Sequence, residues 1–272
     1  MSLIPFEQRV RPYQTIYNFR DFGGYAAGNG TRVVTDRLFR SAHLANLSDE
    51  ELSDIASLGI DLVVDMRHAP ERAKQPSKWS PDTVLTLPKD HAREAAKVAP
   101  HEAFTREEMY SASDARRYMM GSYIARPHDA GFVAIHRDTL LAMTEEGPEG
   151  DSGIGPNVLV HCAAGKDRTG TMCALVQGLL GVSDDDIMAD YLLTRDAVDI
   201  EAILAPAATM FSARHGRDYT PDMLRPMFGV DPDYLEASLD AMGPFDGYAR
   251  DTLGLSDERL ERLRARYREP AA

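Results

Sequence analysis

One short segment constrains this chain more than any other: the string HCAAGKDRTG, residues 161–170, set between an apolar strand and an apolar helix. Residues 158–160 predict the strand, and residues 169–180 predict the helix, which should end near Gly181. Small residues at 163–165 let the backbone curl until several N–H groups point at one spot, and the helix brings the positive end of its dipole there. The segment therefore predicts a loop that binds an anion.

Cys162 and Arg168 would supply the chemistry of this loop. The Arg168 guanidinium can bind two oxygens of one phosphate. The positive field of the loop favours the ionised form of a thiol, so we expect Cys162 to be a thiolate that attacks phosphorus. Thr169 is expected to donate its hydroxyl to the sulfur and stabilise the thiolate when it leaves a phosphocysteine intermediate.

The rest of the loop is predicted to bind the phosphate. Lys166 adds a second cation that suits a substrate with more than one phosphate, although such a lysine is commonly a solvated side chain. Cys173 lies inside the apolar helix and is expected to be packing. The predicted phosphate-binding residues are Cys162, Ala163, Ala164, Gly165, Lys166, Asp167 and Arg168.

Charge and cysteine content exclude several classes of protein. The net charge is −13, which repels nucleic acid and anionic membrane surfaces. Two cysteines in 272 residues make neither a disulfide framework nor a structural zinc site. The N-terminal residues lack a signal peptide pattern and no stretch is long enough to span a membrane, so we expect a cytoplasmic protein, with export by another route left open. Because Arg168 and backbone amides would bind the phosphate, we expect the reaction to need no metal ion or cofactor.

The hydrophobic pattern predicts an α/β fold. Apolar runs at 60–64, 83–87 and 158–160 predict strands, and Ser48 with Glu51 predicts a capping box that starts a helix. Residues 101–144 are helical in pattern, and residues 183–272 contain several helices broken by prolines. Alternating strands and helices favour a partly parallel central sheet flanked by helices. No linker divides the chain, so residues 1–272 are predicted to form one domain.

The loop resembles the signature of the cysteine-dependent protein tyrosine phosphatases: a cysteine, five residues, an arginine, then Ser or Thr. The full string is similar to that of a bacterial family that includes mycobacterial enzymes active on phosphotyrosine and phosphoinositides. Other matching segments are NFRDFGGY ending at Tyr25, the Arg40-Ser41 pair, residues 64–67 with Glu71, and Tyr191-Leu192. The resemblance extends over residues 15–268.

This resemblance implies a hydrolase of phosphomonoesters, with phosphorylated protein or peptide as substrate, phosphoinositide as a further candidate and inorganic phosphate as product. His161 would orient the loop, and Arg20 with Asp21 would brace the floor of the site. The general acid would be either Asp90, on a mobile loop, or Asp167, in the signature loop itself. Helical insertions, at about 101–144 and within 183–272, would form a lid over the site.

Two other functions remain open from the residues alone. The chain could be an inactive phosphatase fold that only binds a phosphorylated partner, although such a binder has no use for Cys162 as a nucleophile. It could also transfer sulfur or reduce arsenate with a loop cysteine, but Cys173 is poorly placed to resolve a disulfide.

Overall fold

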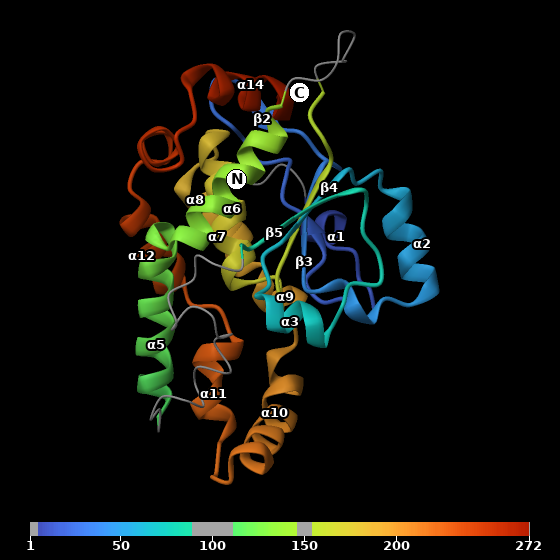
Figure 1. Cartoon of the computed structure of the whole chain (residues 1–272), viewed down its shortest axis with the longest axis vertical. Coiled ribbons are helices and arrows are strands. Elements are labelled where there is room, and N and C mark those ends of the chain that lie inside the picture. The colour runs from blue at the N-terminus through green and yellow to red at the C-terminus, as the bar shows by residue number, and fades with distance from the viewer. Residues whose placement is uncertain (1–4, 89–110, 146–153, 272) are drawn as a thin grey trace.

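The computed structural model describes residues 5–88, 111–145 and 154–271 of the chain. Its centre is a five-stranded sheet in the order β1-β3-β6-β4-β5 (Figure 1). Strands β3, β6, β4 and β5 run parallel, and β1 pairs antiparallel with β3 at one edge. The predicted partly parallel sheet is therefore confirmed. The strands are β1 (Arg20–Asp21), β3 (Leu38–Ser41), β4 (Leu62–Asp65), β5 (Thr83–Thr86) and β6 (Val158–His161).

A second, two-stranded sheet joins the two ends of the chain. Strand β2 (Thr31–Val33) pairs antiparallel with β7 (Arg268–Pro270). The turn before β2 brings Ala26 opposite Arg32. Strand β7 was not predicted, because three residues that include a proline carry no period-2 pattern.

Helices surround the central sheet and account for most of the described chain. The described part of the N-terminal half contains α1 (Phe6–Arg9), α2 (Asp49–Ser57), α3 (Ala69–Lys74), α5 (Ala112–Ala125) and α6 (Ala130–Met143), with the 3-10 turns η1 (Leu44–Asn46) and η3 (Arg126–His128). The C-terminal half contains α7 (Asp167–Leu179), α8 (Asp184–Leu192), α9 (Thr194–Ala197), α10 (Ile200–His215), α11 (Pro221–Phe228), α12 (Pro232–Met242), α13 (Phe245–Gly247), the π-helix η4 (Tyr248–Thr252) and α14 (Asp257–Tyr267).

The two faces of the sheet bury different side chains, as the alternation along a strand requires. In β4, Val63 packs into the smaller core beneath α2, whereas Leu62 and Val64 join the larger core. In β6, Leu159 points to the smaller core and its neighbours to the larger one. Figure 1 shows α2 on one side of the sheet and α6, α7 and α8 on the other. The sheet is thus the middle layer of three.

Local signals in the sequence set several helix ends. Ser48 accepts a hydrogen bond from the Glu51 backbone and the Glu51 side chain returns one, which confirms the predicted capping box. Gly59 follows the end of α2 with a φ of 62°, and Gly181 follows α7 with a φ of 79°. Within the described ranges, no helix combines the length and the apolar character needed to cross a membrane.

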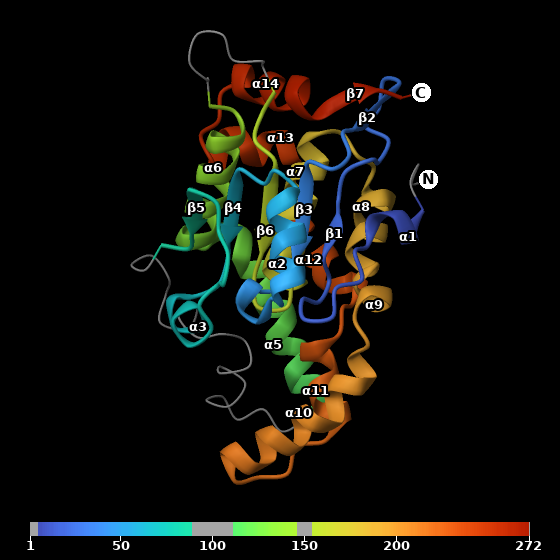
Figure 2. The same ribbon diagram turned by 90° about the vertical axis from the view of Figure 1, so that its right-hand side faces the viewer.

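The carboxyl ends of the parallel strands β3, β4 and β6 meet at one edge of the sheet. Helices α10 and α11 lie beyond this edge, at one end of the molecule, in both views of the ribbon (Figures 1 and 2). Helix α5 packs against α11 and α12 and extends toward the same end. We call α10 and α11 the lid helices, since they stand over the loop that follows β6.

Candidate active site

The loop at the carboxyl end of β6, residues 162–168, is named here the cysteine loop. It ends at the N-terminus of α7, which begins at Asp167 with Lys166 as its N-cap. Gly165 has a φ of 67°, and a Cβ at this position would lie 2.3 Å from the carbonyl carbon of Ser41. Only glycine can therefore occupy this turn without moving β3. The tight turn brings the loop against the first turn of α7, whose free N–H groups can bind an anion.

Two side chains hold the turn from behind. Asn18 Nδ2 donates to the Gly165 carbonyl oxygen at 2.7 Å, and Arg40 donates to the same oxygen at 3.0 Å. Asn18 itself has a φ of 63°, a conformation that asparagine tolerates better than most residues. These bonds fix the backbone of the cysteine loop before any ligand arrives.

Asp190 on α8 neutralises the arginines of this buried layer. Its carboxylate lies 2.6 Å from Arg40 and 3.3 Å from Arg20, and all three side chains are almost fully buried. Burial alone would raise the pKa of Asp190, but the two guanidiniums hold it below its ordinary value. Arg20 therefore lies in the layer beneath the cysteine loop, whereas Asp21 bonds the backbone of Gly23 and Asp36.

Cys162 directly follows β6 and is 2% exposed. It lines the pocket described below. The imidazole of His161 is fully buried behind it, with Nδ1 at 3.5 Å from the Cys162 carbonyl oxygen. Burial lowers the pKa of His161 to about 4, so the ring is neutral at physiological pH. Its position fits an orienting group better than an acid or base.

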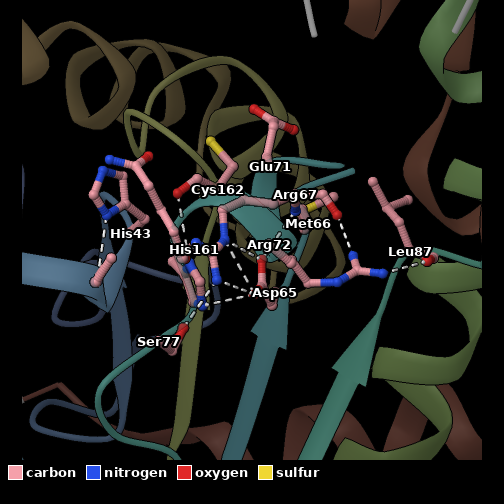
Figure 3. Close-up of polar contacts among 12 residues, drawn as sticks. His43, Asp65, Met66, Arg67, Glu71, Arg72, Ser77, Leu87, His161 and Cys162 are labelled. Carbon is pink, nitrogen blue, oxygen red and sulfur yellow. Dashed lines mark hydrogen bonds and ion pairs between the residues drawn. The ribbon is translucent and has the colours of Figure 1, made fainter. Parts of the chain in front are cut away.

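The Arg168 guanidinium is held by a carboxylate. It donates to both oxygens of Glu71, at 2.6 and 2.9 Å, and to the Met66 carbonyl oxygen at 3.1 Å. Although burial opposes ionisation, Arg168 lowers the pKa of Glu71 to about 2. Figure 3 shows the Glu71 carboxylate and the Cys162 sulfur pointing to the same side of the sheet edge. Glu71 thus fixes the fork of Arg168 near the sulfur.

Asp65, which ends β4, belongs to the scaffold. Its two oxygens accept four hydrogen bonds from the backbone and guanidinium of Arg67 (Figure 3). Arg67 also donates to the Gln75 carbonyl and to Ser77. The pair therefore ties the end of β4 to the segment after α3.

Lys166 is not a solvated side chain, and that interpretation of the sequence is wrong. The residue is 5% exposed, and its ammonium donates to the carbonyl oxygens of Met227 and Gly229, the latter at 2.9 Å. It also lies 3.2 Å from Asp167 Oδ1. The reason is that the last carbonyls of a helix lack partners, so the C-terminus of α11 attracts a cation. Lys166 thereby ties the cysteine loop to a lid helix.

Thr169 differs from its predicted geometry. Its hydroxyl is buried, and in the described part of the chain it has no hydrogen-bond partner, so the predicted bond to the Cys162 sulfur is not formed. A helical threonine usually bonds the carbonyl one turn earlier. Here that carbonyl belongs to Gly165 and is already bonded by Asn18 and Arg40.

A pocket of about 310 Å³ opens over the cysteine loop. Cys162, Lys166, Asp167 and Arg168 line it on the loop side, with His43 nearby. The opposite wall is apolar and comes mainly from the lid helices and the segment before them: Tyr17, Val198, Ile200, Ile203, Met210, Phe211, Met227 and Phe228. This arrangement can receive an anion at its base and an apolar or aromatic group above it.

Methionines on the helices divide between core and pocket. Met119 of α5 is 1% exposed and belongs to the core, as methionines at helical spacing usually do. Met210 of α10 is 57% exposed and lines the pocket. Burial on the two helices therefore assigns Met119 to the core and Met210 to the pocket.

The two candidate acids differ in what the structure describes. Asp167 lines the pocket beside Cys162, and its side chain is 13% exposed. Asp90 lies outside the described residues. Tyr123 of α5 donates to Asp167 Oδ1 at 2.7 Å. Sequence reasoning missed this tyrosine, because nothing in its local pattern distinguishes it from the other apolar positions of the helix.

A cysteine at the end of a central strand, five residues, and an arginine on a helix N-terminus together define the class of cysteine-dependent phosphatases. The model of the tyrosine phosphatase family matches residues 11–269, and the chain belongs to this family. The protein is accordingly a phosphoric monoester hydrolase.

Two curated relatives cover nearly the whole chain. The triple specificity protein phosphatase PtpB of Mycobacterium tuberculosis is 33% identical over 94% of this chain and 98% of its own length. A putative tyrosine-protein phosphatase of Cupriavidus necator is 31% identical over 94% of this chain and 87% of its own. Among solved structures, TpbA of P. aeruginosa aligns with 19% identity over 79% of this chain and 91% of that chain, at a TM-score of 0.23.

Proposed function

We propose that the protein hydrolyses phosphotyrosine in proteins or peptides through a covalent phosphocysteine on Cys162. The observation that carries this proposal is that Cys162, Asp167 and Arg168 line one pocket whose outer wall is apolar. The base suits a phosphate, since the loop gathers backbone N–H groups, a helix N-terminus and a guanidinium. The wall suits the phenyl ring of tyrosine.

In the first step, the Cys162 sulfur forms a bond to phosphorus while the bond from phosphorus to the tyrosine oxygen breaks. The backbone of Ala163, Ala164 and Gly165 and the Arg168 fork hold the phosphoryl oxygens, and Asp167 protonates the leaving oxygen. In the second step, water attacks phosphorus, Asp167 accepts its proton, and the sulfur–phosphorus bond breaks. The products are inorganic phosphate and the Cys162 thiolate, which Thr169 would stabilise if its hydroxyl turned to the sulfur.

Asp167 is our choice as general acid because it lines the pocket and comes from the cysteine loop itself. Asp90 stays a predicted alternative from the family resemblance. The pH dependence of the rate for Asp167→Asn and for Asp90→Asn separates them, because only the loss of the true acid abolishes the alkaline limb of the profile.

Substrates other than phosphotyrosine are also proposed. The relative from M. tuberculosis is named as a triple specificity phosphatase. In this chain, Lys166 could bind a second phosphate once it leaves the carbonyls of α11, which would suit a phosphoinositide. Phosphotyrosine should still be preferred, because a wall of aromatic and aliphatic side chains favours an aryl ester.

Residues 1–272 are proposed to act as one phosphatase domain, with α10 and α11 as the lid. Support comes from the pocket residues that α10 and α11 contribute. The segment 101–144 is proposed to brace the lid, because α5 packs against α11. A reducing compartment such as the cytoplasm would keep Cys162 as a thiol.

A panel of substrates tests the proposed function. Wild-type protein and Cys162→Ser are assayed with a phosphotyrosine peptide, a phosphoserine peptide and a phosphoinositide, in the presence of a chelator. We expect turnover of the phosphotyrosine peptide by the wild type and loss of turnover, with phosphate binding retained, in Cys162→Ser. Binding of the phosphopeptide by the wild type without turnover would instead favour the inactive binding module.

A further inference from the structure

Helix α5 places the hydroxyl of Tyr123 at the edge of the active site. Tyr123 is fully buried, and its hydroxyl lies 2.7 Å from Asp167 Oδ1 and 2.8 Å from the hydroxyl of Tyr191 on α8. Helix α5, helix α8 and the start of α7 therefore meet at one chain of hydrogen bonds, which ends on a residue that lines the catalytic pocket.

The direction of the hydrogen bonds follows from the chemistry of the groups. An ionised carboxylate only accepts, so Tyr123 donates to Asp167. The oxygen of Tyr123 is then free to accept from the Tyr191 hydroxyl. Burial, followed by the nearby Asp167 charge, raises the pKa of both tyrosines, so both keep their protons at every physiological pH.

The two oxygens of Asp167 have different surroundings. Oδ1 accepts from Tyr123 and lies 3.2 Å from the Lys166 ammonium. Within the described residues, Oδ2 has no hydrogen-bond donor. A proton on the carboxyl group is therefore favoured at Oδ2, because Oδ1 already faces two donors. This leaves one defined oxygen to exchange a proton with substrate or water.

Packing fixes the tyrosines as firmly as their hydrogen bonds do. The rings of Tyr123 and Tyr191 meet edge to face, with centroids 6.5 Å apart and an interplanar angle of 80°. A Cβ on Gly170 would lie 2.9 Å from the Tyr191 ring. The glycine that ends the HCAAGKDRTG string thus makes room for Tyr191 against α7.

We infer that Tyr123, oriented by Tyr191, is a positioning residue for catalysis: it holds Asp167 so that Oδ2 delivers the proton to the leaving oxygen. This inference rests on the proposed role of Asp167 as general acid. It assigns a catalytic purpose to α5, a helix that supplies no residue to the cysteine loop and that was expected only to take part in a lid.

Other charged and titratable groups face Asp167 and are part of its setting. Lys166 and Arg168 come from the cysteine loop. Arg126, after α5, donates to the Asp167 carbonyl oxygen at 3.2 Å. From α12, Tyr234 is near enough for the Asp167 charge to contribute to its raised pKa. The Tyr123 hydroxyl differs from these groups, because it is a neutral donor that bonds the Asp167 carboxylate directly.

The test compares Tyr123→Phe with the wild type on two aryl phosphates. Phenyl phosphate has a poor leaving group that needs the proton, whereas para-nitrophenyl phosphate has a good one that needs it less. We expect kcat on phenyl phosphate to fall about tenfold, as loss of one orienting hydrogen bond of about 1.4 kcal/mol implies, with a much smaller loss on para-nitrophenyl phosphate.

Tyr234→Phe is the matched control. Its ring packs on Tyr123, with centroids 5.4 Å apart, but its hydroxyl bonds the Pro226 carbonyl oxygen rather than Asp167. This control should keep the leaving-group dependence of the wild type. Tyr191→Phe should show a weaker form of the Tyr123→Phe effect.

Asp167→Asn separates failure of this inference from failure of the proposed function. If Asp167→Asn loses activity selectively on phenyl phosphate and Tyr123→Phe loses it equally on both substrates, Tyr123 is only structural and the inference is overturned. If Asp167→Asn itself keeps normal activity on both substrates, the assignment of the acid has failed and the inference falls with it.

Discussion

The pair between Glu71 and Arg168 joins stability to catalysis, and Glu71→Gln tests both. The Glu71 side chain is 11% exposed, and its carboxylate accepts two hydrogen bonds from the Arg168 guanidinium. Its pKa falls from 4.5 to about 2 in the folded protein. This lowering of the Glu71 pKa corresponds to about 3 kcal/mol of stability at neutral pH.

The sign of the pH dependence follows from the lowered pKa. The contribution of Glu71 is fully present above pH 4.5, where the carboxyl group is ionised even in the unfolded chain, and it is lost as the pH falls toward 2. The difference in unfolding free energy between wild type and Glu71→Gln, measured by urea denaturation, should therefore be about 3 kcal/mol at pH 7 and should shrink below pH 4.5.

The same substitution should damage catalysis, because the fork of Arg168 loses the carboxylate that aims it. A misplacement of about 1 Å costs roughly 100-fold in rate, so we expect kcat/KM on a phosphotyrosine peptide to fall by about that factor. Glu51→Gln is the matched control: the pKa of Glu51 is also lowered to about 2, by hydrogen bonds from Thr15, Ser48 and Gln14 that overcome the effect of burial. It should lose stability and keep kcat/KM. Unchanged kcat/KM in Glu71→Gln would refute the reasoning.

The other predictions concern the lid and the buried layer. Lys166→Met removes the ammonium from the α11 carbonyls, so a bulky maleimide should alkylate Cys162 roughly tenfold faster, as loss of a charged hydrogen bond of about 1.5 kcal/mol or more implies; an unchanged rate would mean that Lys166 does not hold the lid. Asp190→Asn leaves Arg20 and Arg40 buried without their carboxylate, so the unfolding free energy should fall by about 3 to 5 kcal/mol in urea; a loss under 1 kcal/mol would contradict the buried ion pairs.

The central part of the fold could be predicted from the sequence because each signal there is local. The apolar run at 158–160, the small residues of the cysteine loop and the glycine after α7 each depend on a few neighbouring residues. The capping box at Ser48 is of the same kind. The site residues within the loop were named for the same reason.

The rest could not be predicted, because it depends on contacts between segments far apart in the chain. No residue near Tyr123 in the sequence indicates its hydrogen bond to Asp167, which lies 44 positions away. Lys166 was expected to bind phosphate, with a solvated side chain as the alternative, and its bonds to the end of α11 were not foreseen, since the sequence does not show that α11 ends over the loop. Thr169 was expected to donate to the sulfur, but among the described residues its buried hydroxyl has no partner, and the Gly165 carbonyl one turn earlier is bonded by Asn18 from a distant segment.

Trapping the covalent intermediate tests the central claim most directly. Wild-type protein and Asp167→Asn are mixed with a phosphotyrosine peptide, quenched with acid within milliseconds, and digested for mass spectrometry. We expect a phosphoryl group on the Cys162 sulfur during turnover. Turnover with the phosphoryl group on another residue, or with none on the protein in either form, would contradict it.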